Sequence, residues 1–152
     1  MNAYSDAAIF AWPNMPSAAA QSVDAEARTF KLFRAFSDPT RLRLLALLRQ
    51  AKREGDGEVC VCDLVNVLGV PQPTASRHLA YLRGVGLVAC RKDGAWCHYR
   101  LAPVNGPVHR RLLATLDVCD AVVPEVATDA ERLRLAGCCV ACGTAAGDAD
   151  CC

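Results

Sequence analysis

Apolar residues recur every three or four positions along most of the chain, a period that predicts a largely helical protein. Ser22 can cap a first helix of about 14 residues. The apolar residues aligned along this helix are Ala27, Phe30, Phe33 and Phe36. Asp38 and Pro39 supply the N-cap and the first position of a second helix, RLRLLALLRQAKR, which ends at the GDGE that begins with Gly55.

The next two apolar stretches are joined by a turn. A short helix over about 61–68 ends at Gly69, and its aligned apolar residues are Val61, Leu64, Val65 and Leu68. QPTASRHLAYLRGVG then predicts a helix that ends near Gly84 or Gly86, with Ala75, Leu79 and Leu82 facing inward. Two helices joined by a turn that contains glycine form a helix-turn-helix unit, whose second helix enters the major groove of DNA.

LVACRKDGAWCHYRL breaks the helical period and predicts a β-hairpin, because Asp93-Gly94 is a strong two-residue turn signal between β-favouring residues. The pairs that this turn predicts are Lys92 with Ala95, Arg91 with Trp96, and Cys90 with Cys97. Cys90 and Cys97 should therefore face each other across the hairpin, either as packed thiols or as a redox switch.

The C-terminal part carries two further helical signals. NGPVHRRLLATLDVCDAV predicts an amphipathic helix that ends before Pro124, and Thr128 to Glu131 reads as a capping box for a last short helix. We expect a flexible extension over 1–22, one domain over 23–136, and a flexible cysteine-rich tail over 137–152. The order of elements is typical of a mainly α, α+β fold with a hairpin wing, the winged helix-turn-helix.

The net charge of +1 hides two basic stretches. Residues 28–53 hold eight Lys or Arg against one acid, and residues 72–100 hold five against one. Two basic blocks on an otherwise acidic chain indicate a localised site for a polyanion, although a solvated helix face also explains the first block.

The chain has no apolar run near membrane-spanning length and no signal-peptide pattern, so we expect a soluble cytoplasmic protein with no membrane partner. In a reducing cytosol its ten cysteines are expected to be metal-binding or redox-active rather than disulfide staples. Two of them, Cys60 and Cys62 in EVCVCDL, precede the short helix. Side chains two residues apart point in different directions on a regular helix, but they point to the same side in an extended backbone. If Cys60 and Cys62 bind one ion together, we therefore expect the start of the helix to bend or unwind.

Four segments, FSDPTRLRLLALL, EVCVCDL, QPTASRHLAYLRGVGLV and RKDGAWCHYRL, closely resemble the ArsR/SmtB family of metal-responsive repressors, and its arsenic-sensing branch in particular. The resemblance covers about residues 28–118. It implies a homodimeric winged helix that occupies operator DNA until a soft ion binds. Cys60 and Cys62 match the first two thiols of the family motif ELCVCDL, whereas Val65 stands where the third thiol would be.

The resemblance and soft-ligand chemistry together make arsenite or antimonite the expected inducer, bound by Cys60 and Cys62, with no organic cofactor. Buried core cysteines are the alternative for this pair. Cys119 lies on an apolar helix face, where core packing is expected. The tail residues Cys138, Cys139 and Cys142 are further candidate metal ligands, as part of the same site or of a second one, or else incidental thiols.

For DNA, the polar side chains at the start of the second helix of the unit supply groups that read base edges or bind phosphate: Gln72, Thr74, Ser76, Arg77 and His78. Arg91 and Lys92 at the hairpin tip are expected either to touch the DNA backbone or minor groove or to form a solvated turn. The family's dimerising helix corresponds to residues 106–121, with Val108, Leu112 and Leu116 as expected contacts. His78 and His109 lack the partners that the family's interfacial zinc site needs, and we reject that site.

We therefore expect a transcriptional repressor rather than an enzyme. The same fold responding to cadmium, lead, zinc or thiol oxidation is the first alternative. A thiol oxidoreductase built on Cys139 and Cys142, or a metal-buffering protein, fits less well, because neither needs two basic blocks and a wing.

Overall fold

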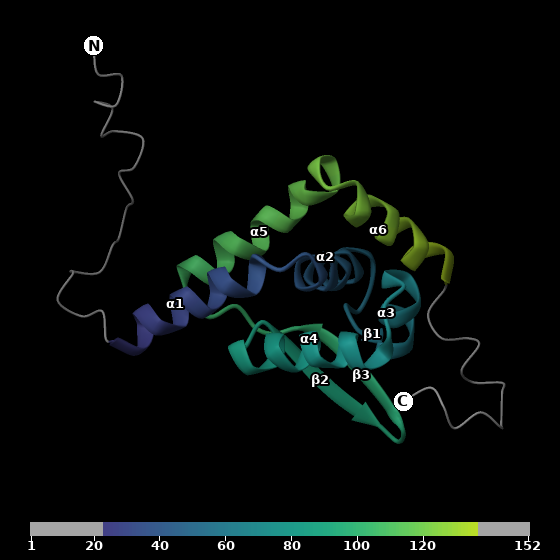
Figure 1. The fold of residues 1–152 in the computed structure, drawn as a ribbon, viewed down its shortest axis with the longest axis horizontal. Helices are drawn as coiled ribbons and strands as arrows, with labels where there is room; N and C mark the ends of the chain where they lie inside the picture. Colours follow the sequence, from purple (N-terminus) through teal and green to yellow (C-terminus); the bar gives the residue numbers. More distant parts are fainter. Residues whose placement is uncertain (1–22, 137–152) are drawn as a thin grey trace, which may run out of the picture.

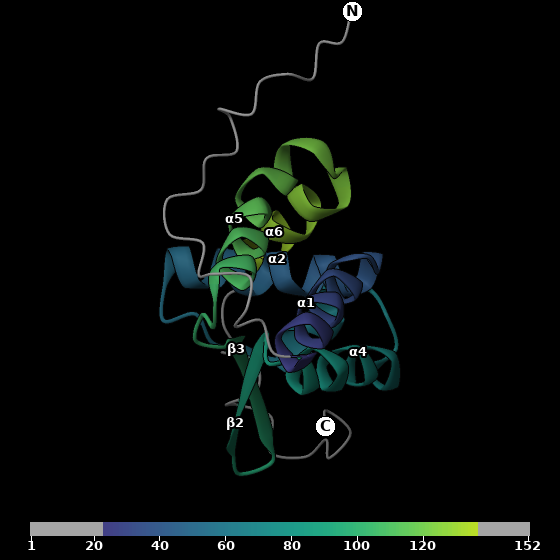
Figure 2. The same ribbon diagram turned by 90° about the vertical axis from the view of Figure 1, so that its left-hand side faces the viewer.

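The computed structural model of the chain describes residues 23–136, which form six helices and one small antiparallel sheet. In chain order the elements are α1 (Val23–Phe36), α2 (Pro39–Glu54), β1 (Val59–Cys60), α3 (Val61–Leu68), α4 (Gln72–Val85), β2 (Val88–Asp93), β3 (Trp96–Leu101), α5 (Pro107–Val122) and α6 (Pro124–Ala136). Helices α1 and α5 lie side by side, and the β2–β3 hairpin projects from the opposite side of the molecule beside α4 (Figures 1 and 2). The fold is the winged helix-turn-helix predicted from the sequence.

The cap and turn signals place α2, α3 and α4 correctly. Asp38 is the N-cap of α2, and its Oδ1 accepts a hydrogen bond from the Arg41 backbone N–H at 2.9 Å. Gly69 and Gly86 end α3 and α4 in the left-handed region, with φ of 65° and 80°. These two helices form the helix-turn-helix unit, and they pack on α2, whose Leu44, Leu45, Leu47 and Leu48 are fully buried.

Helix α1 has the predicted length, but its buried face differs from the aligned phenylalanines. Leu32 and Ala35 enter the core, whereas Phe30 and Phe33 remain 65% and 54% exposed. Helix α1 therefore leaves these two aromatic side chains outside the core.

The sheet contains a strand that the sequence did not predict. Strand β1 pairs with β3, Val59 opposite Tyr99 and Cys60 opposite His98, so the sheet order is β1-β3-β2. Two residues are too few to show a period, and their partner lies about 38 positions further along the chain.

The hairpin register also corrects a prediction. Asp93 pairs with Trp96, which leaves Gly94 and Ala95 as the turn, so Cys90 lies opposite Tyr99 and Lys92 opposite Cys97. The expected Cys90–Cys97 pairing is therefore wrong. The first residue of such a two-residue loop has a positive φ, which glycine adopts more readily than aspartate. Gly94 has a φ of 58°, so the loop Gly94-Ala95 is favoured over Asp93-Gly94. Because pairing moves by two residues, the same side chains face the core in both registers.

The last helix begins earlier than predicted, so the capping box at Thr128 is wrong. Helix α6 starts at Pro124, which suits a first helical position, and the Thr128 hydroxyl donates to the Pro124 carbonyl oxygen at 2.9 Å inside the helix. Asp129 is buried and accepts hydrogen bonds from Arg43 of α2 at 2.6 and 2.8 Å. This ion pair fixes α6 to the centre of the fold.

Three arginines of the first basic stretch make contacts within the fold. Besides Arg43, Arg49 pairs with Asp117 of α5 at 2.8 Å, and Arg41 lies over the Tyr81 ring at 4.5 Å while donating to the carbonyl ends of α1. Part of its charge is thus neutralised by carboxylates within the fold. Among the described residues, no helix is both long and apolar enough to cross a membrane.

Candidate functional site

The two cysteines of EVCVCDL lie where a strand becomes a helix. Cys60 is the last residue of β1 and the N-cap of α3, with extended φ and ψ of −66° and 145°, and Cys62 is the second residue of the helix. They are 1% and 9% exposed. One thiol therefore comes from extended backbone and the other from helical backbone. Both side chains pack in the core, which agrees with the alternative interpretation of this pair as buried core cysteines.

Within residues 23–136 the structure holds no cluster of three or more Cys, His, Asp or Glu side chains suited to a metal ion. Val65, one turn along α3 from Cys62, is half-buried and supplies no ligand atom. Cys119 lies on α5, where its thiol donates to the Thr115 carbonyl oxygen at 3.3 Å, and burial together with Asp120 raises its pKa. It is a packed thiol, as predicted from its helix face.

Cys90 and Cys97 are half-buried neighbours on one face of the hairpin. Burial raises the pKa of Cys90, and the adjacent Cys97 thiol, with which it shares a hydrogen bond, raises it further. The two residues are diagonal rather than directly paired, and both are free thiols. Cys138, Cys139 and Cys142 lie outside the described residues.

Helix α4 and the hairpin lie on the same side of the molecule, away from α5 and α6 (Figures 1 and 2). Arg77 is exposed on α4, whereas Gln72, Thr74 and Ser76 are half-exposed around its first turns. His78 instead turns back toward the start of α2, with its Nδ1 3.6 Å from Asp38 Oδ1. Arg77 is thus an exposed cation near the start of α4, and Arg83 is another in its last turn, whereas His78 lies against Asp38 at the start of α2.

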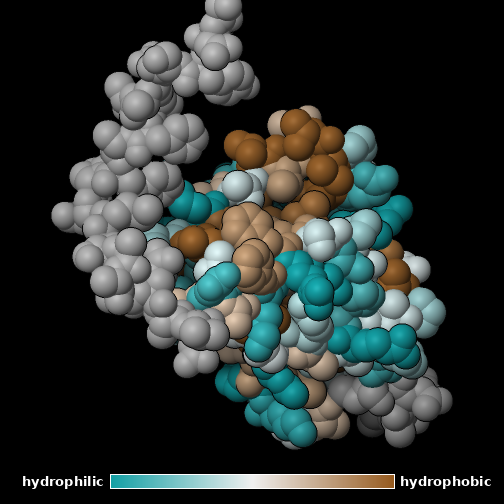
Figure 3. Space-filling model, turned by 60° about the vertical axis from the view of Figure 1, so that its left-hand side comes forward, coloured by the Kyte–Doolittle hydropathy of each residue, from teal (hydrophilic) through white to brown (hydrophobic). Residues whose placement is uncertain are grey.

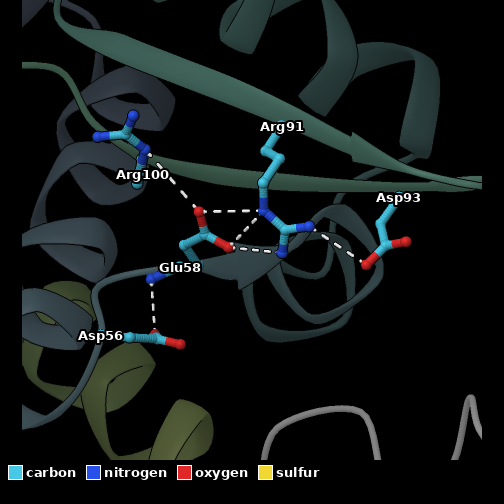
Figure 4. Close-up of polar contacts among 5 residues, drawn as sticks. All are labelled: Asp56, Glu58, Arg91, Asp93 and Arg100. Carbon is cyan, nitrogen blue, oxygen red and sulfur yellow. Dashed lines mark hydrogen bonds and ion pairs between the residues drawn. The ribbon is translucent and has the colours of Figure 1, made fainter.

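Arg91 on β2 is held by carboxylates rather than extended from the hairpin (Figure 4). Its guanidinium donates to Glu58 at 2.7 and 3.0 Å and to Asp93 at 3.2 Å, and Arg100 approaches Glu58 at 3.8 Å. The hydrogen bonds from Arg91 lower the pKa of Glu58. Glu58 stands two residues before Cys60, so this network joins the wing to the strand that carries the thiol. The role of Glu58 could not be predicted from the sequence, because its partner Arg91 is 33 residues away.

The expected dimerisation residues fall into two groups. Val108 and Leu112 are half-buried on α5, but Leu116 is only 4% exposed and belongs to the protomer's own core. The exposed large apolar residues nearby are Val118 and Val122 on α5, with Phe30 and Phe33 on α1. Apolar surface gathers over the end of α5, at the top of the molecule in Figure 3. His109 is buried, its Nδ1 accepts from the Asn105 N–H at 3.1 Å, and burial lowers its pKa.

Residues 38–89 match the model of the arsR family of bacterial regulatory proteins. The chain is 49% identical to the arsenical resistance operon repressor of Escherichia coli K12, over 48% of this chain and 58% of the relative. It is 42% identical to the arsenic resistance transcriptional regulator ArsR2 of Pseudomonas putida, over 56% of this chain and 70% of the relative. Among solved structures it resembles HlyU from Vibrio cholerae, with a TM-score of 0.52 and 25% identity, over 67% of this chain and 98% of HlyU. These relatives are regulators and not enzymes, and the chain belongs to the arsR family of bacterial regulatory proteins.

Proposed function

We propose that this protein is a transcriptional repressor that binds operator DNA as a homodimer in the cytoplasm and is released when trivalent arsenic or antimony binds Cys60 and Cys62. Two of the relatives carry arsenic resistance in their names, which supports a metalloid as the inducer. Both ions are soft and prefer thiolate ligands.

The position of Cys60 is the observation that carries the proposal. This residue is paired with His98 in the wing sheet and is also the N-cap of α3, the first helix of the DNA-reading unit. An ion that draws the sulfur atoms of Cys60 and Cys62 together must change the extended-to-helical transition between them. The change then reaches the wing through β1 and the reading helix α4 through α3.

In the DNA-bound state, Arg77 and its neighbours on α4 would face the major groove, with Lys92 and the hairpin tip on the flanking backbone. The exposed apolar residues of α1 and α5 support a homodimer, because two copies can cover them mutually. A dimer presents two reading helices to a two-fold operator.

The proposal is tested by titrating the reduced protein on fluorescent operator DNA with arsenite, antimonite, cadmium and hydrogen peroxide in separate experiments. We expect arsenite and antimonite to release the DNA at the lowest concentrations. Release by cadmium alone would favour the divalent-metal alternative. Release by peroxide in the absence of any metalloid would favour a thiol-oxidation sensor instead.

A further inference from the structure

The pairing of the three strands places a candidate thiol and the wing in one row. His98 of the central strand β3 pairs with Cys60 of β1 on one side and with Arg91 of β2 on the other. Residues directly opposite each other on neighbouring strands carry their side chains on the same face of the sheet. Cys60 and Arg91 therefore share a face, with one strand between them.

Glu58, which immediately precedes β1, links this strand to both of the others (Figure 4). Its carboxylate accepts hydrogen bonds from Arg91 of β2, at 2.7 Å from Nη2 and 3.0 Å from Nε. The Nε of Arg100, on β3, lies 3.8 Å from the same carboxylate. The Glu58 side chain is 21% exposed, so these contacts are partly shielded from water. One carboxylate thus holds a guanidinium group from each of the two other strands.

The backbone that carries Glu58 is fixed by local contacts. The Glu58 N–H donates to Asp56 Oδ1 at 2.9 Å. Gly57 between them has a φ of 81°, and a Cβ atom there would lie 3.2 Å from the Cα atom of Lys52 in α2. The bend is therefore packed against the end of α2, and Val59, which follows Glu58, is buried. The position of the carboxylate is thus tied to β1 and not to a loose loop.

A second carboxylate on Arg91 provides a contrast. Asp93 accepts from Arg91 Nη1 at 3.2 Å, but it lies on β2, the same strand as Arg91, and its side chain is well exposed. This pair cannot carry a movement from one strand to another. The Arg91–Glu58 pair is shorter, and it joins two strands that are not neighbours in the sheet. Of these two carboxylates, only Glu58 can pass a displacement of β1 to the wing.

We propose that Glu58 is a positioning residue that transmits a displacement of β1 at Cys60 to Arg91 and Arg100 of the wing. The inference rests on the proposed function, and it names the contact through which inducer capture reaches the wing. When β1 shifts, Glu58 either draws Arg91 with it or loses charge-assisted hydrogen bonds to it. In both cases the positive charge of the wing takes a new position relative to the phosphate groups of the operator.

The test compares the wild type with Glu58→Gln, using the full-length reduced protein and arsenite as the probe. The measured quantity is the factor by which saturating arsenite raises the dissociation constant of the operator complex. Glutamine keeps the size of the side chain but removes the charge that holds the two arginines. We expect the factor to fall roughly 2- to 30-fold, the range for substitutions that disturb coupling between two sites. The number of arsenite ions bound per chain, followed by As–S absorbance, should stay the same.

Asp93→Asn is the matched control. It removes the same charge from the same guanidinium group, so both variants should tighten operator binding to a similar extent in the absence of arsenite. Only Glu58→Gln cuts the link to β1, and Asp93→Asn should therefore keep the wild-type factor. An equal fall of the factor in Asp93→Asn would assign the effect to the net charge of the wing and overturn the inference.

Arg91→Gln cuts the same contact from the side of the wing. If the ion pair carries the coupling, the double variant Glu58→Gln, Arg91→Gln should lose no more of the factor than either single variant. Urea denaturation verifies that each variant is folded. Losses that simply add would show that the two residues act independently, contrary to the inference.

A measurement without inducer separates the inference from the proposed function. Since coupling is reciprocal, operator binding should slow hydrogen exchange in peptides that contain Val59 and Cys60, and this protection should shrink in Glu58→Gln but not in Asp93→Asn. A wild-type factor, or absent or unchanged protection, would overturn the inference while leaving the proposed function intact. A wild-type operator complex that ignores arsenite would overturn the proposed function, and the hydrogen-exchange comparison would still decide the role of Glu58.

Discussion

Two pairs of cysteines lie in or beside the same small sheet, yet their surroundings differ. Cys90 and Cys97 are both strand residues, and the hairpin ladder holds them on one face. Cys60 and Cys62 straddle a change from strand to helix, and both are buried. An ion bound by the hairpin pair would leave the ladder unchanged, whereas an ion bound by the junction pair must alter the start of α3. The comparison teaches that a sensing thiol pair needs a backbone that can change state, and proximity alone does not provide one.

The largest expected effect comes from removing one pair at a time. Cys60→Ser, Cys62→Ser should keep the repressor on its operator at arsenite concentrations that release the wild type fully, because serine supplies no soft thiolate. Cys90→Ser, Cys97→Ser should shift half-release by less than about two-fold, or 0.4 kcal/mol. Gel-shift titrations of both variants measure the difference. If arsenite still released Cys60→Ser, Cys62→Ser fully from the operator, the sensing thiols would lie elsewhere in the chain.

The junction should also depend on α6 in a way that the hairpin does not. Asp129→Ala leaves Arg43 without its buried partner and should lower the free energy of unfolding by about 3–5 kcal/mol. Urea denaturation measures this loss. In the same variant, thiol labelling at Cys62 should accelerate more than labelling at Cys90, since Arg43 also bonds the end of α3. Equal acceleration at both sites would contradict the link between α6 and the junction.

The reading helix and the wing offer a second contrast, between two arginines. Arg77 is exposed on α4, so Arg77→Ala should weaken operator binding by about 1–3 kcal/mol if the side chain reads a base. Arg91 is already held by Glu58 and Asp93, and Arg91→Ala should cost less. Anisotropy titrations at one salt concentration compare them, with light scattering to verify that neither substitution changes the oligomeric state. A larger loss of operator affinity in Arg91→Ala than in Arg77→Ala would make Arg91, and not Arg77, the more important DNA contact.

The smallest effect concerns the protonation of the hairpin pair. Because burial and the neighbouring Cys97 thiol raise the pKa of Cys90, its alkylation rate should reach half-maximum at a higher pH than that of an unfolded control peptide. Cys97→Ser removes one of these causes and should move the midpoint back toward lower pH. Peptide mapping after iodoacetamide treatment gives both profiles. An unchanged midpoint in Cys97→Ser would show that the Cys97 thiol does not contribute to the raised pKa of Cys90.

Local signals were sufficient for most helix boundaries. Asp38 before Pro39 marked the start of α2, and Gly69 marked the end of α3, because caps act through neighbouring backbone groups. The start of α6 was missed since a capping-box pattern competed with Pro124. The hairpin register was missed because a two-residue shift preserves the buried face.

The candidate site was predictable only in part. Cys60 and Cys62 stood out by their motif and by the helix that follows them. The strand that carries Cys60 was not visible, because its pairing with His98 is long-range. The same holds for Glu58 with Arg91 and for Arg43 with Asp129, which are separated by 33 and 86 residues. No local pattern encodes such partners, since either residue alone reads as a surface charge.

The burial of Cys60 and Cys62 has a consequence for the speed of the response. Under the proposed function, an inducer that meets closed thiols must wait for the start of α3 to open, so collision and capture are separate steps. At low inducer concentration the rate of release rises in proportion to concentration. At high concentration it reaches a ceiling equal to the opening rate of the strand–helix junction, and this ceiling fixes the shortest delay between exposure to the metalloid and transcription.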